Sequence, residues 1–246
     1  MNKNSFKYIK LDEVDSTNDY VSRRLSQLNL PVCVATDYQT AGKGQGNNTW
    51  HSEKSRNLLF SYAFSPEGLT PGESFYISRI ASLAIKDFYS EYFQGVKIKW
   101  PNDILYEHKK LAGILIENRF YGDSIDKSII GMGLNINQEE FPVFSPAAGS
   151  IRSLTGKTPD LSKALSGVLE KLEYWIDILN NHDFAFIVKE YNRHLFRLME
   201  DAVYKAGDEF FEARLSGVED DGRLILLTPS GQTHKYAFKE VEFIFS

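Results

Sequence analysis

The feature that most constrains the fold is a change of pattern near Glu200. Before it, strand-like stretches alternate with long amphipathic helical patterns. The helical patterns cover residues 71–93, 161–179 and 184–198. After Glu200, short strand patterns follow one another without a helix. The chain is therefore predicted to be an α+β protein with two domains, a main domain of strands and helices over residues 1–200 and a small β-barrel over residues 201–246.

Strand patterns and a helix start can be placed within this frame. Strand-like stretches before Glu200 cover residues 6–11, 32–38, 58–64, 96–100, 110–117 and 125–137. Ser16 is expected to cap a helix, because apolar residues follow it at helical spacing as far as Leu28. Near the C-terminus, turn signals at 219–222 and 229–231 predict strands paired between Phe211 and Ala237.

Charge and composition limit the partners and the compartment. The chain of 246 residues carries a formal net charge of -5, whereas DNA-binding domains usually have a basic surplus, so no nucleic-acid partner is expected. The first ten residues contain no apolar run, and no stretch approaches the roughly 20 apolar residues that span a bilayer, so neither a secretory signal nor a membrane contact is expected. Cys33 is the single cysteine, which excludes an internal disulfide and favours a cytoplasmic location.

Residues 40–57 form a long polar stretch that cannot supply an apolar face, and such loops are often functional. Gly42, Gly44 and Gly46 allow the backbone to approach a ligand and to direct N–H groups at an anion. Lys43 adds a positive charge. A mobile surface loop is the alternative, because the spacing matches neither the Walker A motif nor the dinucleotide fingerprint.

The segment Lys99–Ile104 reads KWPNDI. Pro101 stops a strand, and Asn102 and Asp103 suit a tight turn. The structural interpretation is a plain hairpin turn. The functional interpretation places Lys99 and Asp103 at the end of a strand, facing a ligand.

Lys110 opens the otherwise apolar strand KLAGILIE. Burial of an unpaired ammonium group is costly, and the small neighbours Ala112 and Gly113 leave room for a ligand beside it. A lysine that extends to solvent along its alkyl chain is the alternative.

The segment GMGLNIN at 131–137 places Gly131, Gly133 and Asn135 at alternate positions, which share one face of a strand. A strand face without side chains suits a bound ligand, although a bulge or a helix contact would also use glycine. The amide oxygen of Asn135 could ligate a metal ion.

These four segments, together with the early Asp15-Ser16-Thr17-Asn18, resemble the biotin–protein ligase family, and the match in specific motifs runs from Val14 to Asn137. The resemblance implies a mixed β-sheet catalytic domain flanked by helices, like that of class II synthetases, followed by an SH3-like barrel. It implies that ATP and Mg²⁺ activate biotin to biotinyl-5'-AMP. Biotin would then be transferred to a lysine of a biotin carboxyl carrier protein.

The resemblance also implies residue roles. Biotin or the adenylate would be held by Ser16, Thr17, Asn18, Gln39, Gly42, Lys43, Gly44, Gln45, Trp50, Lys110, Gly113, Gly131 and Gly133. ATP and magnesium would lie near Lys99, Asn102, Asp103 and Asn135, with Asn135 as the metal ligand. Lys110 and Lys43 would be catalytic. The biotin carboxylate and the α-phosphate are both negative, so cations and N–H groups are needed to stabilise the transition state.

The glycine-rich loop departs from the family pattern at two positions. Gln45 stands where the family usually has arginine, and Asn47 where it usually has a third glycine. Because asparagine tolerates positive φ better than most residues, the turn is expected to survive. Lys43 or Arg56 is expected to supply the missing positive charge.

Two other functions fit parts of the pattern. One is a lipoate or octanoate ligase or transferase, which shares the catalytic fold, although Lys99–Asp103 favours the biotin branch. The other is a regulator that binds the adenylate without catalysis. Too few residues precede Asp15 for the DNA-binding domain that some family members carry, so the single-function form is expected, as a monomer or a weak homodimer.

Overall fold

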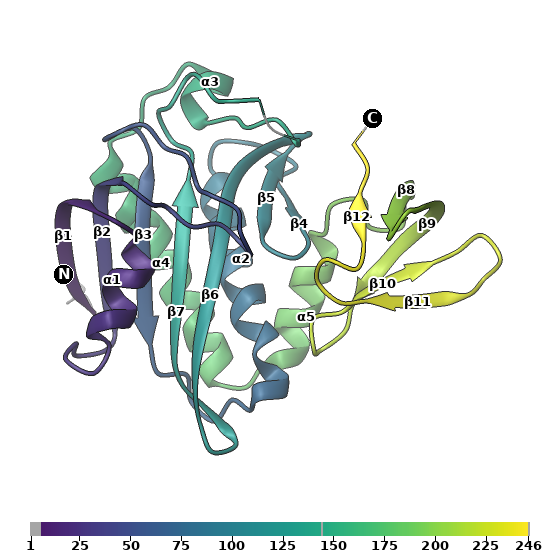
Figure 1. Cartoon of the computed structure of the whole chain (residues 1–246), viewed down its shortest axis with the longest axis horizontal. Helices are drawn as coiled ribbons and strands as arrows, with labels where there is room; N and C mark the ends of the chain where they lie inside the picture. The colour runs from purple at the N-terminus through teal and green to yellow at the C-terminus, as the bar shows by residue number, and fades with distance from the viewer. Residues whose placement is uncertain (1–5, 144, 246) are drawn as a thin grey trace.

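The computed structural model describes residues 6–143 and 145–245 and contains two β-sheets (Figure 1). The larger sheet has seven strands in the order β1-β2-β3-β7-β6-β5-β4. These strands are β1 (Lys7–Val14), β2 (Val32–Gln39), β3 (Leu58–Phe64), β4 (Lys97–Lys99), β5 (Asp103–Tyr106), β6 (Lys109–Tyr121) and β7 (Ser124–Leu134). Strands β1 and β2 run parallel and the other neighbours antiparallel, so the sheet is mixed, as predicted.

Helices cover both faces of the larger sheet. They are α1 (Thr17–Arg24), α2 (Phe75–Tyr89), α3 (Ile151–Thr155), α4 (Leu161–Asn180) and α5 (Phe184–Arg193). Helices α2 and α4 pack together on one face, and α1 lies on the other face against β2, β3 and β7 (Figure 1). In the described part of the chain, no helix combines the length and the apolar character needed to cross a bilayer.

Strand β3 shows why the larger sheet is buried on both faces. Leu58, Phe60 and Tyr62 belong to the core under α2 and α4, whereas Ala63 belongs to the small cluster under α1. All seven residues of the strand are buried, which explains why its sequence is a nearly continuous apolar run with the predicted limits. Ser61 is the polar exception, and it faces the α1 side.

Several predicted elements are shorter in the structure. The helix predicted for 71–93 begins as a 3₁₀ turn at Pro71–Glu73 and is α-helical only from Phe75 to Tyr89. The helix predicted for 184–198 ends at Arg193, because the following segment pairs with β4. The amide of Ile98 donates to the carbonyl of His194 over 2.8 Å, and the amide of Phe196 donates to the carbonyl of Ile98 over 2.8 Å.

Two short elements are not among the helices and strands predicted from the sequence. Helix α3 is capped by Ser150, whose hydroxyl accepts from the amide of Ser153. Strand β5 forms with β4 the hairpin that the structural interpretation predicted, with its turn at residues 100–102; Asn102 lies in that turn, whereas the strand already begins at Asp103. That residue pairs with Lys99 of β4 and Gly113 of β6.

The smaller sheet contains five antiparallel strands, β8 (Asp201–Ala206), β9 (Glu209–Val218), β10 (Leu224–Leu227), β11 (Thr233–Tyr236) and β12 (Glu242–Phe243), in the order β11-β10-β9-β8-β12. The strand pairing predicted between Phe211 and Ala237 is present as β9, β10 and β11. Both predicted turns contain a glycine with positive φ, Gly222 at 91° and Gly231 at 83°.

A buried arginine joins the smaller sheet to the helical layer. Arg79 of α2 is fully buried, and its guanidinium donates to the carbonyl oxygens of Val218 over 3.0 Å and of Glu219 over 2.7 Å. The indole N–H of Trp100 donates to the carbonyl of Gly222 over 2.8 Å. The turn between β9 and β10 is therefore held from two sides, next to the end of β4.

Candidate active site

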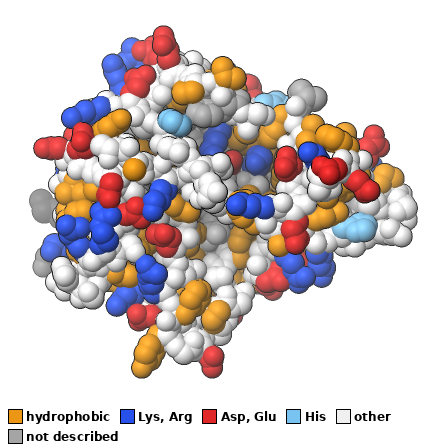
Figure 2. Space-filling model, viewed as in Figure 1, with side chains coloured by type: hydrophobic (Ala, Val, Ile, Leu, Met, Phe, Trp, Pro, Cys, Tyr) orange, Lys and Arg blue, Asp and Glu red, His pale blue; other side chains and the backbone are white. Residues whose placement is uncertain are grey.

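A cavity of about 590 Å³ lies between the glycine-rich loop, strands β6 and β7, and the start of β5. Figure 2 shows Lys and Arg side chains around the hollow between the larger sheet and the C-terminal sheet. The predicted site residues that line the cavity are Ser16, Thr17, Asn18, Gln39, Lys43, Gly44, Gln45, Trp50, Lys99, Asn102, Asp103, Lys110, Gly113, Gly131, Gly133 and Asn135. Of the predicted set, Gly42 does not line it. The structure thus brings together all four segments singled out in the sequence.

Glycines form the floor of the cavity. Gly113 of β6 pairs with Gly133 of β7, and the indole of Trp50 lies across both. A methyl group at Gly113 would be 2.8 Å from the ring of Trp50, and one at Gly131 would overlap the side chain of Asn18. These positions need glycine because side chains from two other segments occupy the space above the strands.

One end of the cavity carries a network of neutral polar groups. The amide of Thr17 donates to Oε1 of Gln39 over 2.8 Å, and the Thr17 hydroxyl lies 3.1 Å from the same oxygen. Ser16 caps α1, and its hydroxyl accepts from the amide of Asp19 over 3.4 Å, as the sequence predicted. Hydrogen-bond donors and acceptors at this end suit an uncharged polar group of a ligand.

Ser61 is a member of this network that sequence analysis missed. Its hydroxyl lies 2.8 Å from Oγ1 of Thr17 and 2.6 Å from Oδ1 of Asn18, and it is fully buried in β3. A signal was available, because Ser61 interrupts the apolar run LLFSYAF, and buried hydroxyls need partners.

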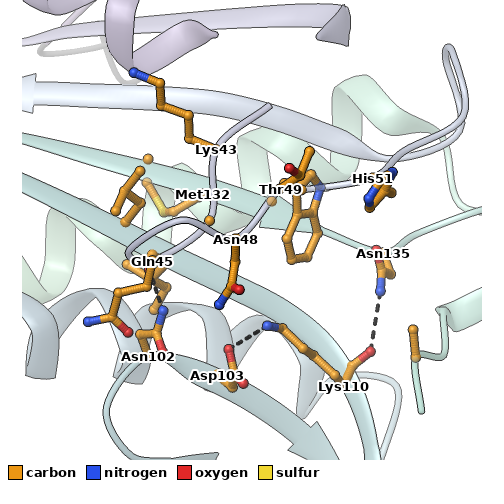
Figure 3. A pocket seen from close by; sticks show the side chains of 18 of the residues that line it. Lys43, Gln45, Asn48, Thr49, His51, Asn102, Asp103, Lys110, Met132 and Asn135 are labelled. Carbon is orange, nitrogen blue, oxygen red and sulfur yellow. Dashed lines mark hydrogen bonds and ion pairs between the residues drawn. The ribbon is translucent and has the colours of Figure 1, made fainter. Parts of the chain in front are cut away.

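The other end of the cavity is charged. Nζ of Lys110 lies 2.7 Å from Oδ1 of Asp103 (Figure 3). Nζ of Lys99 lies 3.7 Å from Oδ2 of the same carboxylate. Burial lowers the pKa of Lys99, while the carboxylate of Asp103 acts in the opposite direction. Two lysines share one carboxylate, so this end retains a positive charge that can attract an anion.

Asn102 and Asn135 are held by backbone contacts beside these charges. Nδ2 of Asn102 donates to the carbonyl of Ile114 over 2.8 Å. Nδ2 of Asn135 donates to the carbonyl of Lys110 over 3.2 Å (Figure 3). Oδ1 of Asn135 is buried and has no hydrogen-bond partner among the described residues, which leaves this oxygen available to a ligand or a metal ion.

The glycine-rich loop closes on itself above the floor. The amide of Trp50 donates to the carbonyl of Gly42 over 2.9 Å, and the amide of Gly44 donates to the carbonyl of Asn48 over 2.7 Å. The Gly44 N–H therefore stabilises the loop rather than pointing at an anion. The positive φ of the turn is at Gly46, at 68°, and not at Asn47, where the family pattern had placed it.

The two cations expected to compensate for Gln45 are engaged elsewhere. Nζ of Lys43 points toward α1 and lies 2.7 Å from Oδ1 of Asp19 (Figure 3). Arg56 lies 3.9 Å from the carboxylate of Glu53 and is not among the residues that line the cavity.

Part of the cavity wall comes from segments that carry no motif. Phe238, from the turn that follows β11, and Phe141, Pro146 and Ala148, from the segment after β7, line the cavity. Their participation depends on how distant parts of the chain pack, so no pattern local to these residues indicates it.

Comparison with known proteins places this arrangement among enzymes that act on carboxylic-acid cofactors. Residues 11–135 match the model of the biotin/lipoate A/B protein ligase family. A bifunctional ligase/repressor of Bacillus subtilis is 27% identical over 226 residues, which cover 89% of this chain and 69% of that protein. A biotin--[acetyl-CoA-carboxylase] ligase of Paracoccus denitrificans is 27% identical over 229 residues, which cover 90% of this chain and 95% of that protein.

Solved structures agree. A biotin protein ligase from Aquifex aeolicus, in complex with biotin and ATP, superposes with a TM-score of 0.79 at 26% identity, and the alignment covers 98% of this chain and 99% of that chain. A biotin protein ligase from Leishmania major in complex with biotin superposes with a TM-score of 0.65 at 22% identity and covers 97% of this chain and 100% of that chain, which supports the fold.

Proposed function

The chain belongs to the biotin/lipoate A/B protein ligase family, and from that premise we propose that it is a biotin–protein ligase. It activates biotin with ATP to biotinyl-5'-AMP and transfers the biotinyl group to a lysine of a carrier protein. The observation that carries the proposal is the single cavity that joins a neutral polar end, a glycine floor and a charged end. The relatives aligned over most of the chain act on biotin by name, which favours biotin over lipoate.

The reaction has two steps. In the first, a carboxylate oxygen of biotin attacks the α-phosphorus of ATP, a C–O–P linkage forms, and pyrophosphate leaves. In the second, the amine of the carrier lysine attacks the carbonyl carbon of this mixed anhydride, and AMP leaves. Both steps move negative charge between oxygen atoms, so fixed cations and N–H groups are the main means by which the protein lowers the barriers.

The neutral network accounts for the biotin head group. The ureido ring of biotin offers one carbonyl and two N–H groups, and these suit the hydroxyls and amides of Ser16, Thr17 and Gln39. The glycine floor at Gly131 and Gly133 then accommodates the tail, with Trp50 packed against it. This orientation directs the biotin carboxylate toward Lys110.

Lys110 is the group that we assign to the reacting oxygens. Lys43 is the second catalytic lysine of the proposal, but its ammonium is paired with Asp19 and would have to leave that carboxylate to act. In the structure the ammonium of Lys110 is paired with Asp103, which Lys99 also contacts. When phosphate oxygens enter, Lys110 can turn to them while Lys99 continues to balance the carboxylate. The ion pair with Asp103 thus keeps Lys110 charged and oriented before substrate arrives.

Magnesium fits the same end of the cavity. Asn135 presents a buried oxygen without a partner among the described residues, and Asp103 presents a carboxylate nearby in the lining. Mg²⁺ usually takes one or two protein oxygens and completes its shell with water and substrate phosphates. When bound, it would offset negative charge on the phosphates of ATP. Asn135 and Asp103 are the residues that would hold it.

The partner in this proposal is the biotin carboxyl carrier domain of a biotin-dependent carboxylase. We propose that the protein acts in the cytoplasm, as a monomer or a weak homodimer.

The expected result is transfer of labelled biotin to a carrier domain only when ATP and magnesium are present. A carrier with its acceptor lysine replaced by arginine should remain unlabelled. If the folded protein labels the carrier with lipoate and not with biotin in parallel reactions, the lipoate branch is correct instead.

Gly133→Ala is expected to raise the KM for biotin, because the added methyl group would be 2.7 Å from Nε1 and Cζ2 of Trp50 and would push the indole into the cavity. Overpacking of this kind costs about 1–3 kcal/mol, and if that cost falls on biotin binding it corresponds to roughly a 5- to 160-fold change in KM. Steady-state kinetics with varied biotin measure it. The matched control is Gly167→Ala in α4, where the nearest atom to the new methyl group is 3.6 Å away. A KM equal to that of the control would show that Trp50 does not define the biotin subsite.

A further inference from the structure

The turn that follows β11 carries a lysine in a conformation that favours glycine. Lys239 has φ 71°. The turn is fixed by two hydrogen bonds, from the amide of Glu240 to the carbonyl of Ala237 over 3.1 Å, and from the amide of Ala237 to Oε2 of Glu240 over 2.7 Å. Positive φ is unfavourable for a residue with a Cβ atom, so a lysine at this position carries a backbone cost that glycine would not.

Lys239 reaches from the C-terminal sheet to the glycine-rich loop. Its ammonium lies where a side chain at Gly46 would begin, since a methyl group there would be 2.7 Å from Nζ. In Figure 1 the yellow turn before β12 extends toward this loop. Gly46 follows Gln45 in the chain and Lys239 follows Phe238, and both Gln45 and Phe238 line the cavity. The contact therefore lies next to two residues of the cavity lining.

Lys239 differs from the lysines of the site in that no carboxylate of the described residues pairs with it. Lys43 is paired with Asp19, and both Lys99 and Lys110 with Asp103. Lys239 has no carboxylate within ion-pair distance among residues 6–143 and 145–245, and its ammonium lies 5.7 Å from the ring centroid of Phe238. It is a cation beside the cavity lining whose charge remains available to an anionic ligand.

We propose that Lys239 supplies the positive charge that Gln45 lacks, and that it binds the phosphoryl group of the adenylate from the C-terminal side of the loop. Gln45 offers donors without charge, whereas charge-assisted hydrogen bonds to phosphate are roughly twice as strong as neutral ones. The four-carbon chain of lysine is flexible enough to move its ammonium from Gly46 to a phosphate beside Gln45. Lys239 thus takes the role that the sequence had suggested for Lys43 or Arg56, and it couples the C-terminal sheet to retention of the intermediate.

The proposal rests on the proposed function, and the test is the rate at which preformed biotinyl-adenylate leaves the protein. Lys239→Ala is expected to speed release by about tenfold, as for the loss of one charge-assisted hydrogen bond at an exposed site. Lys239→Arg should release at the native rate. Lys239→Gly removes the ammonium but relieves the backbone, so it should release as fast as the alanine variant while being at least as stable.

The matched control is Lys205→Ala. Lys205 belongs to the same sheet, and its ammonium lies 5.6 Å from the ring centroid of Phe210, but, unlike Lys239, it has no chain neighbour in the cavity lining and does not approach the glycine-rich loop. Its replacement should leave release unchanged. Gln45→Arg, added to Lys239→Ala, should restore slow release, which a purely structural role of Lys239 would not predict.

Two results would overturn the proposal while leaving the proposed function intact. One is a native protein that forms and retains biotinyl-adenylate while Lys239→Ala releases it at the rate of Lys205→Ala. The other is a Lys239→Ala defect that Gln45→Arg does not correct. A folded native protein that forms no biotinyl-adenylate would instead contradict the proposed function itself.

Discussion

Lys110→Ala is expected to slow formation of biotinyl-adenylate by about 10²–10³-fold, the usual effect of losing one group that stabilises an oxyanion in the transition state. The ammonium of Lys110 is 2.7 Å from Asp103 and faces the cavity, and its side chain keeps 29% of its accessible surface. Stability should change little by comparison, because Lys99 remains beside Asp103 after the substitution. Pyrophosphate release under single-turnover conditions measures the step.

Lys109→Ala is the control for this prediction. Lys109 precedes Lys110 in β6, is exposed, and does not line the cavity. Its replacement removes the same charge from the same strand, so its rate of pyrophosphate release should stay near the native value. If Lys110→Ala and Lys109→Ala release pyrophosphate equally fast, Lys110 does not contact the reacting oxygens.

Arg79→Met is expected to lower the free energy of unfolding by about 3 kcal/mol or more, because it leaves buried partners of a charged donor unsatisfied. The carbonyls of Val218 and Glu219 would lose their donor, while methionine keeps much of the side-chain volume. Urea denaturation followed by circular dichroism gives the value.

The control is Arg214→Met in the same C-terminal sheet. Arg214 forms an exposed pair with Asp201, with Nε 2.6 Å from Oδ1. Exposed pairs contribute about 0–1 kcal/mol, so its loss should be small. Equal destabilisation by the two substitutions would mean that the buried contacts of Arg79 do not hold the turn between β9 and β10.

The features that were predicted best from the sequence are those set by interactions between residues that are close in the chain. The limits of β3 follow from a buried apolar run, and the cap at Ser16 follows from the preference of a short hydroxyl side chain for the start of a helix. The motif residues that converge on the cavity were also identified, because glycine and lysine are unusual on the face of an apolar strand.

The sequence could not predict features that depend on tertiary packing. Nothing near Lys43 indicates that its ammonium pairs with Asp19 of α1, and nothing near Phe238 places it on a cavity built mainly from residues before 150. The helix predicted to run to residue 198 stops at Arg193, because pairing with β4 outweighs helical propensity over the last turn.

The carboxylate of Asp103 between two lysines has a consequence for turnover. It is an anion attached to the protein itself, so its effective concentration at Lys110 is far above that of any free anion in solution. Under the proposed reaction, pyrophosphate that has just been cleaved competes with Asp103 for the same ammonium group. The carboxylate can reclaim Lys110 without diffusing, which favours product departure over rebinding. In the proposed reaction Asp103 would thus limit product inhibition by pyrophosphate, once it no longer holds magnesium.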